Sequence, residues 1–156
     1  MIRQILRMAR NYTMVRIFKL TFSITYFIVL FYLVFFVNRR KYNYSHNLNI
    51  VPIRNTMVGF RHISDLGYFN FYSNLLGNIL LFMPLPVIAI SVFKINRFFN
   101  IMLLCFSLSF SIELMQYVFR VGVADIDDII LNTLGAFIGY CFFLVFKRAF
   151  TEIQQN

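Results

Sequence analysis

The chain alternates between long apolar runs and shorter polar segments. The first run covers residues 20–37, LTFSITYFIVLFYLVFFV, and contains no charged residue. Three further runs cover about residues 73–93, 101–119 and 129–146. A transmembrane α-helix needs roughly 20 predominantly apolar residues to cross the hydrocarbon core of a bilayer. The pattern therefore predicts an all-α fold, an integral membrane bundle of four transmembrane helices.

Polar and basic segments divide the chain around these runs. Residues 1–19 form a basic N-terminal segment, expected to be cytoplasmic and to lie on the membrane surface as a short helix. Residues 20–148 carry the four-helix domain, and 149–156 form a cytoplasmic tail. A basic stretch before an apolar run is also typical of a signal peptide. No small-residue cleavage site follows the first run, so we expect an uncleaved anchor. The polar stretch 38–70 is long for a structureless loop, which favours a functional or interfacial role.

Composition and charge agree with a membrane protein. Hydrophobic residues make up 60% of the chain and charged residues 13%, whereas soluble domains carry about 25% charged residues. The net charge of +9 could indicate nucleic-acid binding, but the basic residues flank the apolar runs, which instead sets orientation in a membrane. With a cytoplasmic N-terminus, nine basic residues lie inside and six outside. Both termini are therefore predicted to be cytoplasmic, and no nucleic-acid partner is expected.

The cysteines and prolines bear on two further predictions, the absence of a metal site and a kink in the second span. Cys105 and Cys141 lie inside apolar runs with no histidine or cysteine at metal-ligand spacing, so no metal site and no cofactor are predicted. Pro84 and Pro86 lie within the second run, where proline removes backbone hydrogen bonds. They predict a kink in the second span.

Polar residues recur at helical spacing in three of the four spans. Four-residue steps place Asn70, Asn74 and Asn78 on one face of the second span. In the predicted topology all three polar stripes lie toward the outer membrane surface, so we expect them to meet in one cavity. The stripes of the third and fourth spans consist of Ser109, Glu113, Gln116 and Arg120, and of Asp128, Asn132, Gly135 and Gly139, with Asp125 and Asp127 just ahead.

Several of these residues also have a structural interpretation. Asp125 and Asp128 stand at a helix start, where carboxylates cap free backbone amides. Arg120 could mark the interface or form a bidentate pair with Asp127 or Asp128. The segment from Gly135 to Gly139 is a close-approach motif that favours helix packing.

Glu113 is the strongest functional candidate, because a carboxylate inside a span costs roughly 2–3 kcal/mol unless it is paired or hydrated. Its expected partners are Arg120, Asn78 and Asn132; a purely structural polar network is the alternative. The residues predicted to bind a ligand are Asn74, Asn78, Glu113, Gln116, Arg120, Asp127, Asp128 and Asn132. Of these, Glu113, Asp127 and Asp128 are also the candidates for catalysis.

Three blocks in the chain resemble the VanZ-like family of bacterial membrane proteins. The first two blocks are Asn78-Ile79-Leu80-Leu81-Phe82-Met83-Pro84 and Ile112-Glu113-Leu114-Met115-Gln116. The third runs from Ala124 to Ala136 and opens with Ala124-Asp125-Ile126-Asp127-Asp128. The asparagine-and-proline segment near Pro52 also matches, so the resemblance covers about residues 47–140. Pro86 departs from the glycine that the family often has there, which affects only the local path of the helix.

The resemblance implies a cell-membrane protein whose founding relative is linked to resistance to glycopeptide antibiotics, teicoplanin more than vancomycin. The family has no agreed catalytic residues that the resemblance could assign to this chain. The leading hypothesis is an envelope-modifying protein that binds an amphiphile, with membrane lipids, a lipid-linked cell-wall intermediate or a lipoglycopeptide as partners. The alternatives are a membrane-embedded enzyme that uses Glu113 with Asp127 or Asp128 as acid and base, and a small lipid transporter. Homo-oligomerisation stays open.

Overall fold

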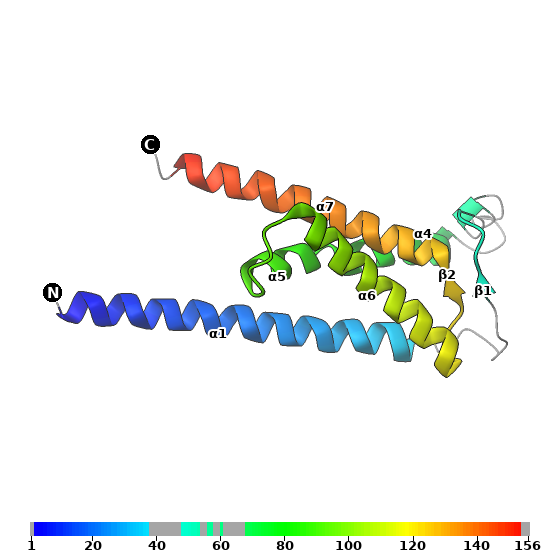
Figure 1. The fold of residues 1–156 in the computed structure, drawn as a ribbon, viewed down its shortest axis with the longest axis horizontal. Helices are drawn as coiled ribbons and strands as arrows, with labels where there is room; N and C mark the ends of the chain where they lie inside the picture. Colours follow the sequence, from blue (N-terminus) through cyan, green and yellow to red (C-terminus); the bar gives the residue numbers. More distant parts are fainter. Residues whose placement is uncertain (1, 38–47, 54–55, 58–59, 61–67, 154–156) are drawn as a thin grey trace.

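The computed structural model describes residues 2–37, 48–53, 56–57, 60 and 68–153. Within these residues the chain forms an all-α bundle, and four helical segments are long and apolar enough to cross a membrane. Both chain ends lie at the same end of the bundle (Figure 1). The four-span prediction is confirmed, and the protein is a multi-pass membrane protein. Its spans are Asn11–Phe36, Tyr72–Ser91, Phe98–Phe119 and Ile126–Glu152.

The first span belongs to one long helix. Helix α1 covers Ile2–Tyr32 and continues into a π-helical turn, η1, at Leu33–Val37. The basic segment expected to form a separate surface helix is instead the first part of α1. No proline or glycine interrupts the segment, so the helix propagates through it. At 1.5 Å per residue α1 is about 46 Å long, which exceeds the hydrocarbon core of about 30 Å.

The second span is broken at its prolines, which confirms the predicted kink. Helix α4 covers Tyr68–Phe82, and a short helix α5 covers Leu85–Ser91. Pro84 and Pro86 have no backbone N–H, so the α4 ladder cannot continue through them. At the end of α4 the carbonyl of Leu81 accepts a hydrogen bond of 2.9 Å from the Tyr26 hydroxyl of α1. A side chain of the first span thereby satisfies a backbone group at the break.

Helix α7 is the centre of the bundle. It covers Ile126–Ile153 and packs against α4, α5 and α6, the last of which covers Phe98–Phe119. Glycines bring α7 against the backbone of α4: a Cβ atom on Gly135 would lie 2.1 Å from the Ile79 carbonyl oxygen, and one on Gly139 would lie 2.0 Å from that of Met83. The predicted close packing through these glycines is confirmed.

The apolar side chains divide between a core and a lipid-facing surface. Phe82, Ile101, Cys105 and Ala136 are fully buried where α4, α6 and α7 meet. Many large apolar side chains on all four spans point outward, which suits contact with lipid rather than water. Cys141 is exposed in the last span.

A short parallel strand pair joins the first loop to the start of α7. Strand β1 covers Leu48–Asn49, and β2 covers Ala124–Asp125. Leu48 pairs with Ala124, and Asn49 pairs with Asp125. The pair lies at the end of the bundle opposite the chain termini (Figure 1). It fixes part of the long polar segment that the sequence predicted to be more than a structureless loop.

Candidate functional site

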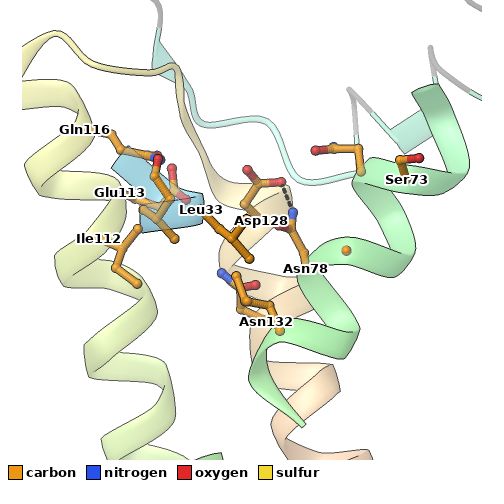
Figure 2. A pocket seen from close by; sticks show the side chains of 12 residues that line it. Leu33, Ser73, Asn78, Ile112, Glu113, Gln116, Asp128 and Asn132 are labelled. Atoms are coloured by element: carbon orange, nitrogen blue, oxygen red, sulfur yellow. Dashed lines mark hydrogen bonds between the residues drawn. The ribbon is translucent and has the colours of Figure 1, made fainter. Parts of the chain in front are cut away.

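A cavity of about 270 Å³ lies between the first span and the other three. Figure 2 shows α6 side chains on one of its sides, Asn78 of α4 on the other, and Asp128 and Asn132 of α7 between them. The described residues that line it are Leu33, Val34, Ser73, Asn74, Gly77, Asn78, Leu81, Ile112, Glu113, Gln116, Asp128 and Asn132.

Six of the eight predicted ligand-binding residues line this cavity. They come from three helices, so the prediction that three polar stripes meet agrees with the geometry. The two predicted residues outside its lining are Arg120 and Asp127. The side chain of Asn70 lies outside the described part of the structure. The six are Asn74, Asn78, Glu113, Gln116, Asp128 and Asn132.

Glu113 is buried, with 5% of its surface exposed, and its carboxylate points to the start of α7. Its Oε2 accepts a hydrogen bond of 2.8 Å from the backbone N–H of Asp125. This partner replaces Arg120, Asn78 and Asn132, the three that the sequence predicted. Part of the cost of burying the carboxylate is thus offset by a backbone amide.

Asp128 and Asn78 form the contact between α7 and α4 at the cavity. The Asn78 side-chain amide donates a hydrogen bond of 2.6 Å to Asp128 Oδ1 (Figure 2). The close packing at Gly135, two turns along α7, brings the two helices near enough for this bond. Asp128 therefore faces the cavity and does not cap its own helix through that oxygen.

Asn132 lies one turn deeper than Asp128 and is 4% exposed. Its Nδ2 donates a hydrogen bond of 2.9 Å to the hydroxyl of Ser109, which is fully buried on α6. Its Oδ1 is also buried and finds no hydrogen-bond partner among the described residues. A buried amide oxygen without a partner costs on the order of 1–3 kcal/mol, so this atom is an acceptor for a water or a ligand.

Gln116 connects the third span to the first. Its Nε2 donates a hydrogen bond of 3.2 Å to the carbonyl of Val34 in η1. Carbonyls in the last turn of a helix lack intrahelical donors, and Gln116 supplies one. The side chain lines the cavity and at the same time holds the wall formed by η1.

Asp127 and Asp125 hold the first loop. The Asp127 carboxylate accepts hydrogen bonds from the Ile53 amide, from the Thr56 amide at 2.9 Å and from the Thr56 hydroxyl at 3.0 Å. Asp125 Oδ1 accepts from the Asn49 side chain at 2.8 Å and from the Asp127 amide at 2.9 Å, as expected for a helix-capping residue. These two carboxylates line a smaller pocket of about 50 Å³, which shares Asn74 and Asp128 with the main cavity.

Arg120 is exposed and does not line the cavity. It follows the last residue of α6 in a left-handed conformation, with φ of 54°, and its backbone N–H closes the helix onto the carbonyls of Gln116 and Tyr117. The prediction that Arg120 shares a stripe with Glu113 and Gln116 assumes that the helix continues through residue 120, but α6 ends at Phe119. The left-handed turn takes the side chain out of that stripe.

Sequence reasoning missed the contribution of the first span to the cavity. Leu33 and Val34 lie in a run that is apolar on every side, so the sequence carries no signal for the face they use. Gly77 was missed as well; a Cβ atom there would meet nothing within 4 Å. Its four-residue spacing from Ser73 on α4 could have placed both on one face.

The cavity can accommodate a polar group at the end of an apolar one. Its carboxylates and amides face the same space as Leu33, Leu81 and Ile112. Among the described residues, no group of three or more histidine, cysteine, aspartate or glutamate side chains could hold a metal ion. Two carboxyl groups in one cavity could also serve as a general acid and a general base toward a bound substrate.

Comparison with known proteins identifies relatives of the chain. The VanZ/LLP1 family model matches residues 22–147. Protein VanZ of Enterococcus faecium is 29% identical over an alignment of 121 residues that covers 73% of this chain and 66% of that protein. The match thus spans just under two thirds of the length of that relative. No solved structure matches the chain.

Proposed function

Because this chain belongs to the VanZ/LLP1 family, we propose that it binds an amphiphile or a lipid head group in the cavity between its spans. Through this binding it contributes to resistance to glycopeptide antibiotics of the teicoplanin type, or to modification of the cell envelope. Its partners in this proposal are membrane lipids, a lipid-linked cell-wall intermediate or a lipoglycopeptide.

The observation that carries the proposal is the mixed lining of the cavity. Glu113 and Asp128 face it from two helices, while Leu33 and Leu81 supply apolar surface beside them. An amphiphile has the same combination, a polar head and an apolar tail. A water molecule takes about 30 Å³ of liquid volume, so about 270 Å³ has room for a small head group and leaves the chains in the bilayer.

We place the cavity at the outer leaflet of the bacterial cell membrane, with both termini in the cytoplasm. The residues that line the cavity belong to η1, to α4, to the last turns of α6 and to the first turns of α7. The end of the bundle that carries the β1–β2 pair, next to those turns of α6 and α7, lies away from the chain termini (Figure 1). The split of nine basic residues against six supports cytoplasmic termini. A ligand would then reach the site from the outer surface or sideways from the lipid.

Catalysis is the second candidate function. Glu113 and Asp128 face one cavity, and such a pair could act as acid and base on a lipid or lipid-linked substrate. Asp127, the third candidate from the sequence, is held by three donors of the first loop. We therefore assign it to structure in this proposal.

The test is to fill the cavity without disturbing the fold. A leucine at Gly77 would extend into open space, so Gly77→Leu should occupy the cavity at little cost to packing. The wild type, this variant, Glu113→Gln and the control Glu152→Gln are expressed in a susceptible bacterium, and teicoplanin susceptibility and membrane protein level are measured. Glu152 is exposed at the opposite end of α7, so its substitution matches Glu113→Gln in chemistry only.

We expect Gly77→Leu and Glu113→Gln to abolish any gain in resistance while the protein still accumulates, and Glu152→Gln to retain the gain. Unchanged resistance in the filled variant would contradict a role for the cavity. Lipid analysis of the same strains separates the two functions, because only an enzyme leaves a new or missing lipid species.

A further inference from the structure

The carboxylates of the cavity can accept more hydrogen bonds than they receive from the described residues. Its buried amide donors already have partners: Asn132 bonds Ser109, and Gln116 bonds the Val34 carbonyl. Among the described residues, Glu113 accepts a hydrogen bond from a backbone amide, and Asp128 accepts one from Asn78. An ionised carboxylate offers about four lone-pair positions, so most of this capacity is unused.

Asn132 Oδ1 gives an independent indication of a ligand. The side chain is 96% buried and lines the cavity, and this oxygen has no partner among the described residues. Figure 2 places Asn132 below Asp128, toward the inner part of the cavity. A ligand that enters past the carboxylates would therefore meet a third acceptor. The natural complement of three acceptors is a group with three donors.

The lining argues against three other head groups. Phosphate needs arginine, lysine or backbone donors, and none of the described lining residues is basic. Quaternary ammonium groups are recognised by aromatic cages, and no described lining residue is aromatic. Calcium takes six to eight oxygen ligands, whereas no three acidic side chains in the described part of the chain are arranged so that they could hold a metal ion.

We propose that the cavity binds the primary ammonium group of an amphiphile, whose three N–H donors reach Glu113, Asp128 and Asn132 Oδ1. The inference rests on the proposed function, because it assumes that the cavity takes an amphiphile, and it adds the chemistry of the head group. Opposite charge offsets the cost of placing the buried Glu113 and the partly buried Asp128 carboxylates inside the bundle. The apolar residues beside them then contact the first methylenes of the tail.

The proposal is tested with the full chain in nanodiscs of phosphatidylcholine, whose head group has no N–H donor. The thermal unfolding midpoint is measured with dodecylamine, dodecyltrimethylammonium, dodecyl phosphate and dodecyl maltoside. Phosphatidylethanolamine mixed into the bilayer and free ethanolamine distinguish a lipid head group from a soluble amine. The variants are Gly77→Leu, Asp128→Asn and the control Glu152→Gln.

We expect dodecylamine and phosphatidylethanolamine to raise the midpoint in a saturable manner, and the trimethyl compound not to do so. Asp128→Asn should weaken dodecylamine binding about tenfold or more, since a charged hydrogen-bond partner is lost. Gly77→Leu should abolish the binding, and Glu152→Gln should keep it.

Other outcomes overturn the proposal in distinguishable ways. Equal stabilisation by the trimethyl compound would show a response to charge alone, and protection by free ethanolamine would assign a soluble amine. Stabilisation by the phosphate or maltoside compound that Gly77→Leu removes would refute the ammonium group but keep an amphiphile site. If no amphiphile raises the midpoint, the proposed function fails together with this inference.

Discussion

The three aspartates at the start of α7 lie within four positions of one another, yet their side chains have different partners. Asp125 and Asp127 accept hydrogen bonds from the first loop, and Asp128 faces the cavity and accepts from Asn78. Successive residues of a helix point about 100° apart, so Asp127 and Asp128 face different hydrogen-bond partners. The cluster therefore combines an anchor for the loop with one wall of the cavity.

Replacing Asp127 by asparagine should destabilise the protein and leave the cavity intact. The new NH₂ group would face N–H and O–H donors, and a charged acceptor of three hydrogen bonds would be lost. We expect a loss of roughly 1.5–3 kcal/mol in the free energy of unfolding, measured with denaturant in detergent. Asp128→Asn is the matched control, since it keeps the acceptor for Asn78 and should change stability less. Wild-type stability of Asp127→Asn would contradict the anchoring role.

Arg120 should be replaceable by glycine. Its left-handed backbone conformation costs an L-residue about 1–2 kcal/mol, which glycine avoids at the expense of greater freedom in the unfolded chain. Its side chain is exposed and away from the cavity. We expect Arg120→Gly to raise stability by up to about 1 kcal/mol and to leave teicoplanin susceptibility unchanged. A variant that folds but loses resistance would return Arg120 to the functional site.

At the scale of helices, the contact of α7 with α4 sets the geometry of the cavity. Gly135 and Gly139 let the two backbones touch, and the same contact brings Asn78 to Asp128. The break at Pro84 then turns α5 toward the core, where Leu85 and Ala89 are buried. Small residues and prolines thus position polar side chains that lie one to two turns away.

Gly135 in this contact and Gly77 at the cavity should respond oppositely to alanine. At Gly135 the added methyl would lie 2.1 Å from a backbone oxygen that cannot move alone, so Gly135→Ala should cost about 1–3 kcal/mol or more. At Gly77 it would meet nothing within 4 Å, so Gly77→Ala should stabilise α4 by about 0.5–1 kcal/mol. Thermal unfolding in detergent compares the two variants directly. Equal effects would show that helix propensity, and not packing, decides at both positions.

Periodicity was informative for these helices and uninformative outside them. The apolar runs predicted the four spans, and four-residue spacing placed Glu113, Asp128 and Asn132 in one cavity. The β1–β2 pair was missed because two-residue strands have no period to detect. Its stability comes from side chains and backbone groups that meet only in the folded chain, such as Asn49 with Asp125.

At the scale of the whole molecule, α1 is less integrated than the other spans. Helix α7 contacts α4, α5 and α6, whereas α1 packs mainly against α5. Hydrogen bonds from Tyr26 of α1 to the Leu81 carbonyl and from Gln116 to the Val34 carbonyl of η1 also join the first span to the bundle. The wall of the cavity that η1 forms thus packs less closely against the other helices, and a ligand that enters from the lipid would pass beside it.

The topology is tested by labelling exposed positions in intact cells. The variants are Arg120→Cys, at the cavity end of the bundle, and Glu152→Cys, near the C-terminus. We expect a membrane-impermeant maleimide to modify the first in intact cells and the second only after lysis, because the basic residues favour cytoplasmic termini. The unsubstituted protein controls for Cys105 and Cys141. Labelling in the reverse pattern would indicate the opposite orientation, with both termini outside.

The anchoring of the first loop also orders events during synthesis. Asn49 pairs with a residue 76 positions later, and the Thr56 amide with one 71 positions later. At about 5–20 residues per second, a ribosome needs roughly 4–15 s to make that intervening chain. Throughout this interval the loop has been made and its aspartates have not. Insertion of the last helix is therefore the step that anchors the loop at this end of the bundle, and we expect a chain arrested before residue 125 to leave the loop without these partners.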